Sequence, residues 1–282
     1  MSIRLAMRRA ARRAPALLRD AAPRVGEFLE SLAQPDGGFR GRADGSDLYY
    51  TAFGLSGLLA LGREFDRAAV ARYARGFGAG EGLDLAHLAC LARVAADCGL
   101  QLDDAMRDAI LARVAGLRAA DGGFGSAPGA ARGTAYGAFL ALGIFQDLGR
   151  EVSGAAALIA ACLGLRAEDG GFGNEPGRRA GATPATAAAL TVLAELGAPA
   201  PPEACAWLCA RCDSEGGFYA VAGAPVPDLL STATALHALA SAGAALDRVR
   251  EPCVEYVDSL WSPRGGFRSE EHTSELQSRI PI

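Results

Sequence analysis

The sequence predicts an all-α protein built from repeated helical hairpins, and three observations support this prediction. First, a Gly-Gly-Phe motif recurs, with intervals of 38, 47, 48, 46 and 49 residues between successive copies of its Phe. Second, the segments between the copies carry apolar residues at helical spacing. Third, β-branched residues are scattered and nowhere alternate with polar ones, so strand signals are nearly absent. A period of this size is typical of repeat proteins, in which each unit buries its apolar face against its neighbours.

The motif supplies the turns of these hairpins. Two adjacent glycines end a helix because they adopt backbone angles that other residues resist. The Phe that follows is predicted to anchor the turn in the core. The complete copies end at Phe39, Phe124, Phe172, Phe218 and Phe267, and Arg75-Gly76-Phe77 is a degenerate copy.

The third repeat shows the plan of one hairpin. Apolar residues from Met106 to Leu117 follow the i, i+3, i+4, i+7 spacing and predict a helix over 104–117. Asp103 and Asp104 stand at its start, where the helix dipole favours acidic side chains. After the turn and a loop rich in Gly, Pro and Ala, an apolar segment predicts a second helix over 134–148.

The next two repeats follow the same plan. The fourth predicts helices over 153–166 and 183–196, and the fifth over 202–211 and 229–242. The second helices are apolar on most faces and rich in Ala, as expected of an inner layer. The first helices carry Arg and Glu, as expected of an outer layer.

Composition narrows the functional classes. The formal net charge of −4 gives no electrostatic reason to expect a nucleic-acid partner. Half of the residues are hydrophobic, but no apolar run reaches the length of a membrane span. The seven cysteines lie mostly in Ala- and Leu-rich helical segments, and we interpret them as reduced thiols of a cytoplasmic protein.

Both ends of the chain differ from the repeats. Residues 1–24 contain seven Arg and no apolar signal-peptide core. We expect a solvated leading helix there, with contact to an anionic membrane surface as the alternative. Residues 268–278 match the translation of a common sequencing adapter, so we interpret 268–282 as a non-native tail and predict a chain cut short after the sixth turn. The predicted domains are thus 1–24, a repeat domain over 25–267, and the tail.

Residues 28–39, Phe-Leu-Glu-Ser-Leu-Ala-Gln-Pro-Asp-Gly-Gly-Phe, resemble the repeat shared by protein prenyltransferase β subunits and terpene cyclases. The Gly-Gly-Phe form, with Gly-x-x-Pro-Gly at 125–129 and 173–177, is closer to the prenyltransferase branch. The cyclase branch usually ends the motif with Trp and needs an Asp-x-Asp-Asp acid, which this sequence does not contain. The resemblance implies an α-α toroid, an (α/α)6 barrel of helical hairpins around a central apolar cavity, here with its sixth inner helix missing.

The resemblance also implies a zinc site, which this sequence only partly matches. In the family, an Asp and a Cys two residues apart bind zinc together with the His of an Asp-x-Tyr-His-Thr segment, and the zinc lowers the pKa of the substrate thiol. Asp228 matches the Asp ligand, but Leu230 occupies the Cys position. Residues 47–51 are similar to the His segment, with Tyr49 in place and Tyr50 instead of the His. Zinc is therefore implied by resemblance alone, and the site is degenerate.

Candidate substrate contacts come from the same resemblance. Arg132 stands where a family segment has His, four residues before Tyr136, and a guanidinium suits a diphosphate. Arg178, beside Arg179, follows Pro-Gly and is either a phosphate ligand or a solvated loop residue. With Tyr49 and Tyr50, these residues predict binding of an isoprenoid diphosphate or another apolar ligand in the cavity. The resemblance further implies a helical partner subunit.

Other groupings have a structural as well as a functional interpretation. Cys205, Cys209 and Cys212 have the C-x3-C-x2-C spacing of iron–sulfur enzymes, but on a helix this spacing places small apolar side chains on one face. His87, three residues after an Asp, and His237 are either core histidines or ligands.

Three functions therefore remain open at this stage. The first is a prenyltransferase-like enzyme that transfers an isoprenoid from a prenyl diphosphate to an acceptor. The second is a non-catalytic toroid that binds a lipid or a protein partner, which Leu230 in the Cys position favours. The third is a terpene cyclase-type fragment, which the missing acid motif disfavours. Whether the chain is an enzyme is not decided by its sequence.

Overall fold

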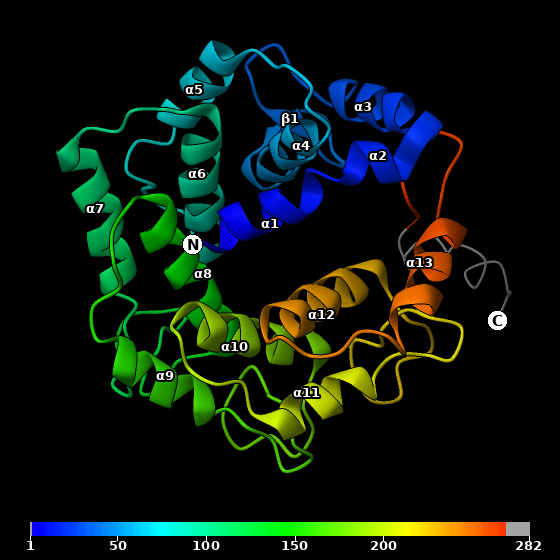
Figure 1. Cartoon of the computed structure of the whole chain (residues 1–282). Helices are drawn as coiled ribbons and strands as arrows, with labels where there is room; N and C mark the ends of the chain where they lie inside the picture. Colours follow the sequence, from blue (N-terminus) through cyan, green and yellow to red (C-terminus); the bar gives the residue numbers. More distant parts are fainter. Residues whose placement is uncertain (1, 269–282) are drawn as a thin grey trace, which may run out of the picture. The chain divides into compact units, whose positions relative to one another are not determined.

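The computed structural model of the chain describes residues 2–268, and the prediction of an all-α protein is confirmed for them (Figure 1). Thirteen α-helices, one 3-10 helix and two strands of two residues occur in this range. The tail predicted to be non-native lies, apart from Arg268, outside the described residues. The second helix of the sixth hairpin would follow Phe267 and lies outside them too.

The chain separates into two compact units. Unit 1 comprises Met1–Arg118, Gly125–Ala130 and Leu140–Ser153, and unit 2 comprises Ala119–Phe124, Ala131–Phe139 and Gly154–Ile282. The elements of unit 1 are α1 (Ile3–Ala11), α2 (Ala14–Leu18), η1 (Arg19–Ala21), α3 (Ala22–Glu30), β1 (Phe39–Arg40), β2 (Ser46–Asp47), α4 (Leu48–Ala60), α5 (Arg67–Arg75), α6 (Leu85–Cys98) and α7 (Asp104–Ala115). Those of unit 2 are α9 (Ala155–Leu163), α10 (Thr183–Glu195), α11 (Pro202–Cys209), α12 (Leu229–Ser241) and α13 (Arg250–Ser259), and α8 (Ala135–Asp147) contributes to both units.

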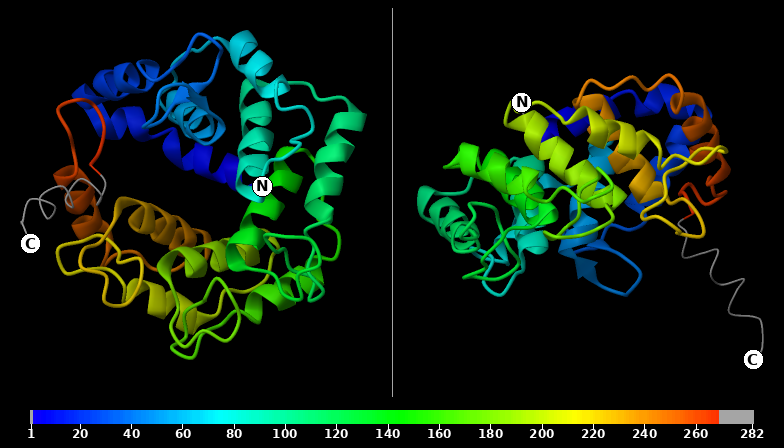
Figure 2. Two further views of the ribbon diagram at one scale, coloured as in Figure 1. Left: turned by 180° about the vertical axis from the view of Figure 1, so that it is seen from behind. Right: turned by 90° about the horizontal axis from the view of Figure 1, so that it is seen from below.

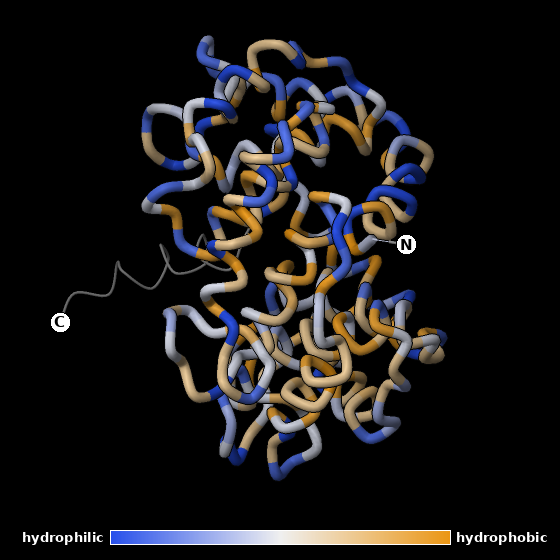
Figure 3. The backbone as a smooth tube through the Cα atoms, turned by 90° about the vertical axis from the view of Figure 1, so that its left-hand side faces the viewer, coloured by the Kyte–Doolittle hydropathy of each residue, from blue (hydrophilic) through white to orange (hydrophobic). Residues whose placement is uncertain are grey.

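Each unit has two layers of helices. In unit 1, α4 and α6 lie side by side, with α3 against α4 and α5 against α6 (Figures 1 and 2). In unit 2, α10 and α12 lie side by side, with α9 and α11 against α10. The first helix thus contacts the second in the first, second, fourth and fifth hairpins, as the sequence predicts. Figure 3 shows apolar and hydrophilic segments alternating along the backbone.

The predicted helices are all present, with small differences at their ends. The helix predicted over 134–148 is α8, and those predicted over 183–196 and 229–242 are α10 and α12. The largest difference is at α9, which ends at Leu163 instead of 166 because the next turn begins there. The strands β1 and β2 were not expected. They pair Phe39 with Asp47 in a short antiparallel ladder.

The Gly-Gly-Phe turn is a repeated structural module. Its Phe side chain is at most 2% exposed at positions 39, 124, 172 and 218, so the predicted anchoring is confirmed there. The first glycine has a positive φ in every complete copy, for example 94° at Gly170, a conformation that glycine adopts without strain. The preceding Asp169 accepts a hydrogen bond from the Gly171 amide at 3.1 Å, which closes the turn.

The Arg-rich segment corrects one expectation. We expected a solvated leading helix, and Arg9 and Arg12 are indeed exposed. The first turn of α1 is instead packed into unit 1, where Ile3 is 1% exposed. Arg4 donates to Asp97 of α6 and to Asp147 of α8, both at 2.8 Å, and these two carboxylates are almost fully buried. The buried acids attract this arginine, which composition alone does not show.

Among residues 2–268, no helix is both long enough and apolar enough to cross a bilayer.

Candidate functional site

Three aromatic side chains protrude from the start of α4 in unit 1. Tyr49 and Tyr50 meet edge to face with ring centroids 5.8 Å apart, and Tyr49 and Phe53 lie 4.7 Å apart. All three are exposed, Phe53 to 51%. We call Tyr49, Tyr50 and Phe53 the α4 aromatic cluster. It contains two of the residues that the sequence predicts for substrate binding.

The fold of the turn explains why these rings face outward. Asp47 caps α4 by accepting the Tyr50 amide at 3.0 Å, and Thr51 accepts the Phe39 amide at 2.9 Å. These two bonds fix the first turn of α4 with Thr51 inward, so Tyr49 and Phe53, four residues apart, share another face. Burial, followed by smaller effects of neighbouring groups, raises the pKa of the Tyr49 hydroxyl, which stays neutral at physiological pH.

The start of α8 carries a second, smaller aromatic pair, described within unit 2. The rings of Tyr136 and Phe139 are stacked with centroids 6.4 Å apart, and Tyr136 is 47% exposed. Asn174, from the loop after the fourth turn, accepts the Tyr136 amide through its side chain at 3.0 Å and the Ala135 amide through its carbonyl at 3.3 Å. The loop that contains Arg178 therefore packs on the start of α8.

The two predicted arginines differ in their surroundings. Arg178 is exposed and donates to Glu175 at 2.7 Å, so a carboxylate three residues away compensates its charge. Arg132 is exposed and forms no ion pair with any residue in the part of the chain that the structure describes. Its guanidinium is therefore the freer of the two to bind an anion. The amides of the first turn of α8 are less available, because Asn174 already accepts two of them.

Asp228 has a structural task at the start of α12. Its carboxylate accepts the Ser231 amide at 2.7 Å, and the side chain is largely buried. Leu230 is 62% exposed in the position that would need a thiolate. Within residues 2–268 no group of three or more His, Cys, Asp and Glu side chains is placed to hold a metal ion. The described residues therefore do not fit the zinc site that the resemblance implies.

The remaining candidate ligands are dispersed. His87 binds Asp84, with 2.8 Å between Nδ1 and Oδ1, at the start of α6. Burial lowers the pKa of His237 in α12, so its ring is neutral at physiological pH. Cys205 and Cys209 lie on α11, where burial raises the pKa of both thiols.

Sequence reasoning missed three residues of these surfaces. Phe53 and Phe139 follow a predicted tyrosine by four and three residues, so their helical spacing could have identified them. Asn174 had no such signal, because its role depends on how one loop meets the neighbouring helix.

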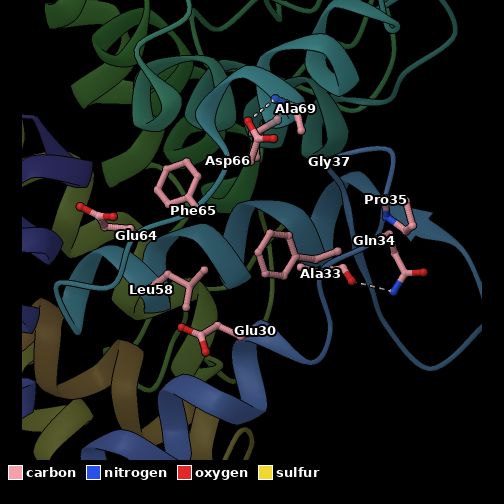
Figure 4. A pocket seen from close by; sticks show the side chains of 12 residues that line it. Glu30, Ala33, Gln34, Pro35, Gly37, Leu58, Glu64, Phe65, Asp66 and Ala69 are labelled. Atoms are coloured by element: carbon pink, nitrogen blue, oxygen red, sulfur yellow. Dashed lines mark hydrogen bonds between the residues drawn. The ribbon is translucent and has the colours of Figure 1, made fainter.

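A groove elsewhere in unit 1 contains none of the predicted site residues. It has a volume of about 310 Å³ and lies between α3 and the start of α5 (Figure 4). Leu58 and Phe65 form part of its walls, with Glu30 and Glu64 nearby. Glu30 binds Arg63 at 2.8 Å. The groove separates two outer helices, whereas the aromatic cluster begins the inner helix α4.

Comparison with known families agrees with the repeat pattern. The profile of the prenyltransferase alpha-alpha toroid domain matches residues 20–72, 68–220 and 212–281. No curated protein matches the chain.

Proposed function

Because the chain belongs to the prenyltransferase alpha-alpha toroid domain family, we propose that it binds an isoprenoid chain through the α4 aromatic cluster. The observation that carries this proposal is the exposure of Phe53, whose ring is half accessible although it belongs to an inner helix. Apolar side chains gathered on an exposed surface commonly mark a binding site. The toroid family also favours an apolar ligand.

The chemistry of the cluster suits an isoprenoid. Each branched, unsaturated unit of such a chain presents flat apolar surface to an aromatic ring, and burial of apolar area stabilises the complex by about 25 cal/mol per Å². The ring of Tyr49 already contacts the rings of Tyr50 and Phe53. Little side-chain freedom is therefore lost when a ligand covers them.

A second candidate function is transfer of the isoprenoid from its diphosphate. The specific observation in its favour belongs to unit 2 by itself: the guanidinium of Arg132 is exposed and forms no ion pair with the described residues, and arginine binds phosphate groups through two donors. The described residues offer no zinc site, so we derive no thiolate step. A helical partner subunit and a cytoplasmic location remain predictions, and the terpene cyclase alternative still lacks its Asp-x-Asp-Asp acid.

Calorimetric titration of the full chain with farnesol tests the binding proposal. We expect saturable binding, and we expect Phe53→Ala to weaken it by roughly 5- to 30-fold, because an aromatic contact contributes about 1–2 kcal/mol. Leu163→Ala is the matched control, because Leu163 is also exposed but lies on the outer helix α9. Absence of binding, or equal effects of the two variants, would contradict the proposal.

Titration with farnesyl diphosphate distinguishes the two functions. If unit 2 binds the diphosphate group through Arg132, farnesyl diphosphate binds more tightly than farnesol, and Arg132→Gln removes most of the difference. Arg9→Gln serves as the control for overall charge, since Arg9 is exposed on α1. Equal affinity for both ligands would leave binding of the apolar chain as the function. Retention of about one zinc ion per purified chain would reopen the metal-dependent alternative.

A further inference from the structure

One position of the Gly-Gly-Phe turn links successive hairpins. This connector position lies six residues before the Phe of the turn. Arg118 occupies it in the third repeat and donates to the carbonyl of Ser153, just before α9. Arg166 occupies it in the fourth, with Nη2 3.7 Å from Oε2 of Glu203 in the first turn of α11. In both cases the side chain reaches the start of the next outer helix.

In the fifth repeat a thiol pair takes the place of these polar contacts. Cys212 occupies the connector position before Phe218, and its Sγ lies 3.7 Å from Sγ of Cys253 in α13. We propose that Cys212 and Cys253 form an intramolecular disulfide when the protein meets a low-molecular-weight disulfide, and that this bond joins the fifth turn covalently to α13.

The surrounding backbone keeps the two thiols together. A side chain at Gly216 would lie 2.0 Å from the carbonyl oxygen of Pro252, so the turn and α13 are in direct contact there. Tyr256 of α13 also donates to the carbonyl of Pro227 at 2.8 Å. A disulfide needs its sulfur atoms about 2.0 Å apart. Rotation about the Cα–Cβ bonds can supply the remaining approach without separating the two elements.

The two thiols differ in accessibility, which sets the order of the reaction. Cys212 lines a cleft of about 260 Å³ together with Tyr219 and residues 221–224. Cys253 is only 1% exposed. A small oxidant therefore meets Cys212 first, and Cys253 is the resolving thiol.

The chemistry is two successive thiol–disulfide exchanges. Cys212 loses its proton and attacks one sulfur of the oxidant RSSR, which forms a mixed disulfide and releases RS⁻, which takes up a proton to become RSH. Cys253 then loses its proton and attacks Sγ of Cys212, which closes the protein disulfide and releases a second RSH. Two protein thiols are thus oxidised and one RSSR is reduced to two RSH.

The first exchange is slow because the Cys212 thiolate is scarce. Burial, followed by the adjacent Cys253 thiol and smaller effects of Asp213 and Cys209, raises the pKa of Cys212 to about 12. The proposal therefore concerns oxidation over long exposure, in contrast to the fast response of a low-pKa sensor thiol.

The test is oxidation of the folded full chain with bis(2-hydroxyethyl) disulfide, followed by mass spectrometry. We expect the intact mass to fall by about 2 Da, the two hydrogens lost on disulfide formation. Cleavage after Arg211 separates Cys212 from Cys205 and Cys209. Trypsin should therefore yield a peptide 212–248 linked to a peptide 251–264. The melting temperature should rise, because the bond restricts the unfolded chain.

Two variants make the result decisive. Cys253→Ser should leave a persistent mixed disulfide on Cys212, because the resolving thiol is gone. Cys209→Ser, at the nearest other thiol on α11, should give the same link as the unaltered chain. A link from Cys212 to Cys209, a persistent mixed disulfide in the unaltered chain, or no link at all in protein that circular dichroism shows to be folded would each overturn the proposal.

Discussion

The helices α4 and α12 begin in the same way and present different surfaces. Asp47 and Asp228 each cap their helix by accepting the amide three residues on, at 3.0 and 2.7 Å. Thr51 and Thr232, four residues after the caps, each accept the amide of the turn's Phe, at 2.9 and 2.8 Å. The same local bonds thus build both helix starts.

The residues between cap and threonine carry the difference. Each stretch has three residues and begins with a leucine, Leu48 or Leu229. Tyr49 and Tyr50 follow in α4, but Leu230 and Ser231 follow in α12, and Ser231 is 1% exposed. The cap and the threonine maintain the turn, whereas the position after the leucine is exposed in both helices and differs between them, Tyr49 in α4 and Leu230 in α12. Function in this chain is therefore to be sought at exposed positions of this kind, and α4 has the aromatic ones.

The largest expected effect distinguishes the buried Phe residues of the turns from the exposed aromatic residues of α4. Phe218→Ala should lower the free energy of unfolding by about 3–5 kcal/mol, because it leaves a cavity in a fully buried turn. Phe53→Ala removes the same ring from an exposed position and should cost less than about 1 kcal/mol. Urea denaturation of both variants measures the contrast. Equal losses would mean that Phe53 belongs to the core and not to a binding surface.

In unit 1 the helix α1 also packs against α4, and its Arg4 gives the second prediction. Arg4→Gln removes the nearest cation of two buried carboxylates, which keep the more distant Arg8 at 3.5 Å and Arg93 at 3.9 Å. It should lower the free energy of unfolding by about 2–4 kcal/mol at about pH 8. Burial raises the pKa of Asp147 although Arg4 opposes the shift, so loss of Arg4 raises it further. Arg9→Gln, on the exposed side of α1, is the matched control.

The sign of the pH dependence follows from this shift. An acid whose pKa is higher in the folded state contributes stability that is present below its unfolded-state pKa and is lost as pH rises through the folded-state pKa. Without Arg4 the folded-state pKa of Asp147 is higher still, so its carboxyl is closer to neutral at about pH 5 in the variant. The loss of unfolding free energy caused by Arg4→Gln should therefore be smaller at about pH 5 than at about pH 8. Denaturant titrations at both pH values measure it. A deficit that shrinks with rising pH would refute the assigned role of Asp147.

Because α4 and α12 begin with the same hydrogen bonds, the same substitution in each should lower the free energy of unfolding by the same amount. Thr51→Val and Thr232→Val each leave a buried Phe amide without its acceptor and should each cost about 1–2 kcal/mol. Thr234→Val is the control, because Thr234 lies nearer the surface and bonds only the carbonyls of its own helix. Clearly unequal losses at 51 and 232 would show that the two starts are not equivalent.

The same contrast explains what could be predicted from the sequence. The turns, hairpins and layers were predictable, because Gly-Gly-Phe and helical spacing act locally and recur in each repeat. Tyr49 and Tyr50 were identified by resemblance, and Phe53 was detectable from its spacing. The packing of Arg4 against Asp97 and Asp147 was not predictable, because these residues are about 90 to 140 positions apart. Asn174 on the start of α8 depends equally on tertiary packing.

The smallest expected effect tests whether the exposed position after Leu229 in α12 tolerates substitution, as the equivalent position of α4 does. Leu230→Tyr places the side chain of Tyr49 at the equivalent site of α12, where the native residue is 62% exposed. The free energy of unfolding should change by less than about 0.5 kcal/mol, because the larger ring meets solvent and not the core. Ser231→Tyr, one residue further and buried, should instead cost about 1–3 kcal/mol through overpacking. If both changes are tolerated, or neither is, the start of α12 does not divide into a structural and a variable position. The aromatic residues of α4 would then lose their distinction as a functional surface.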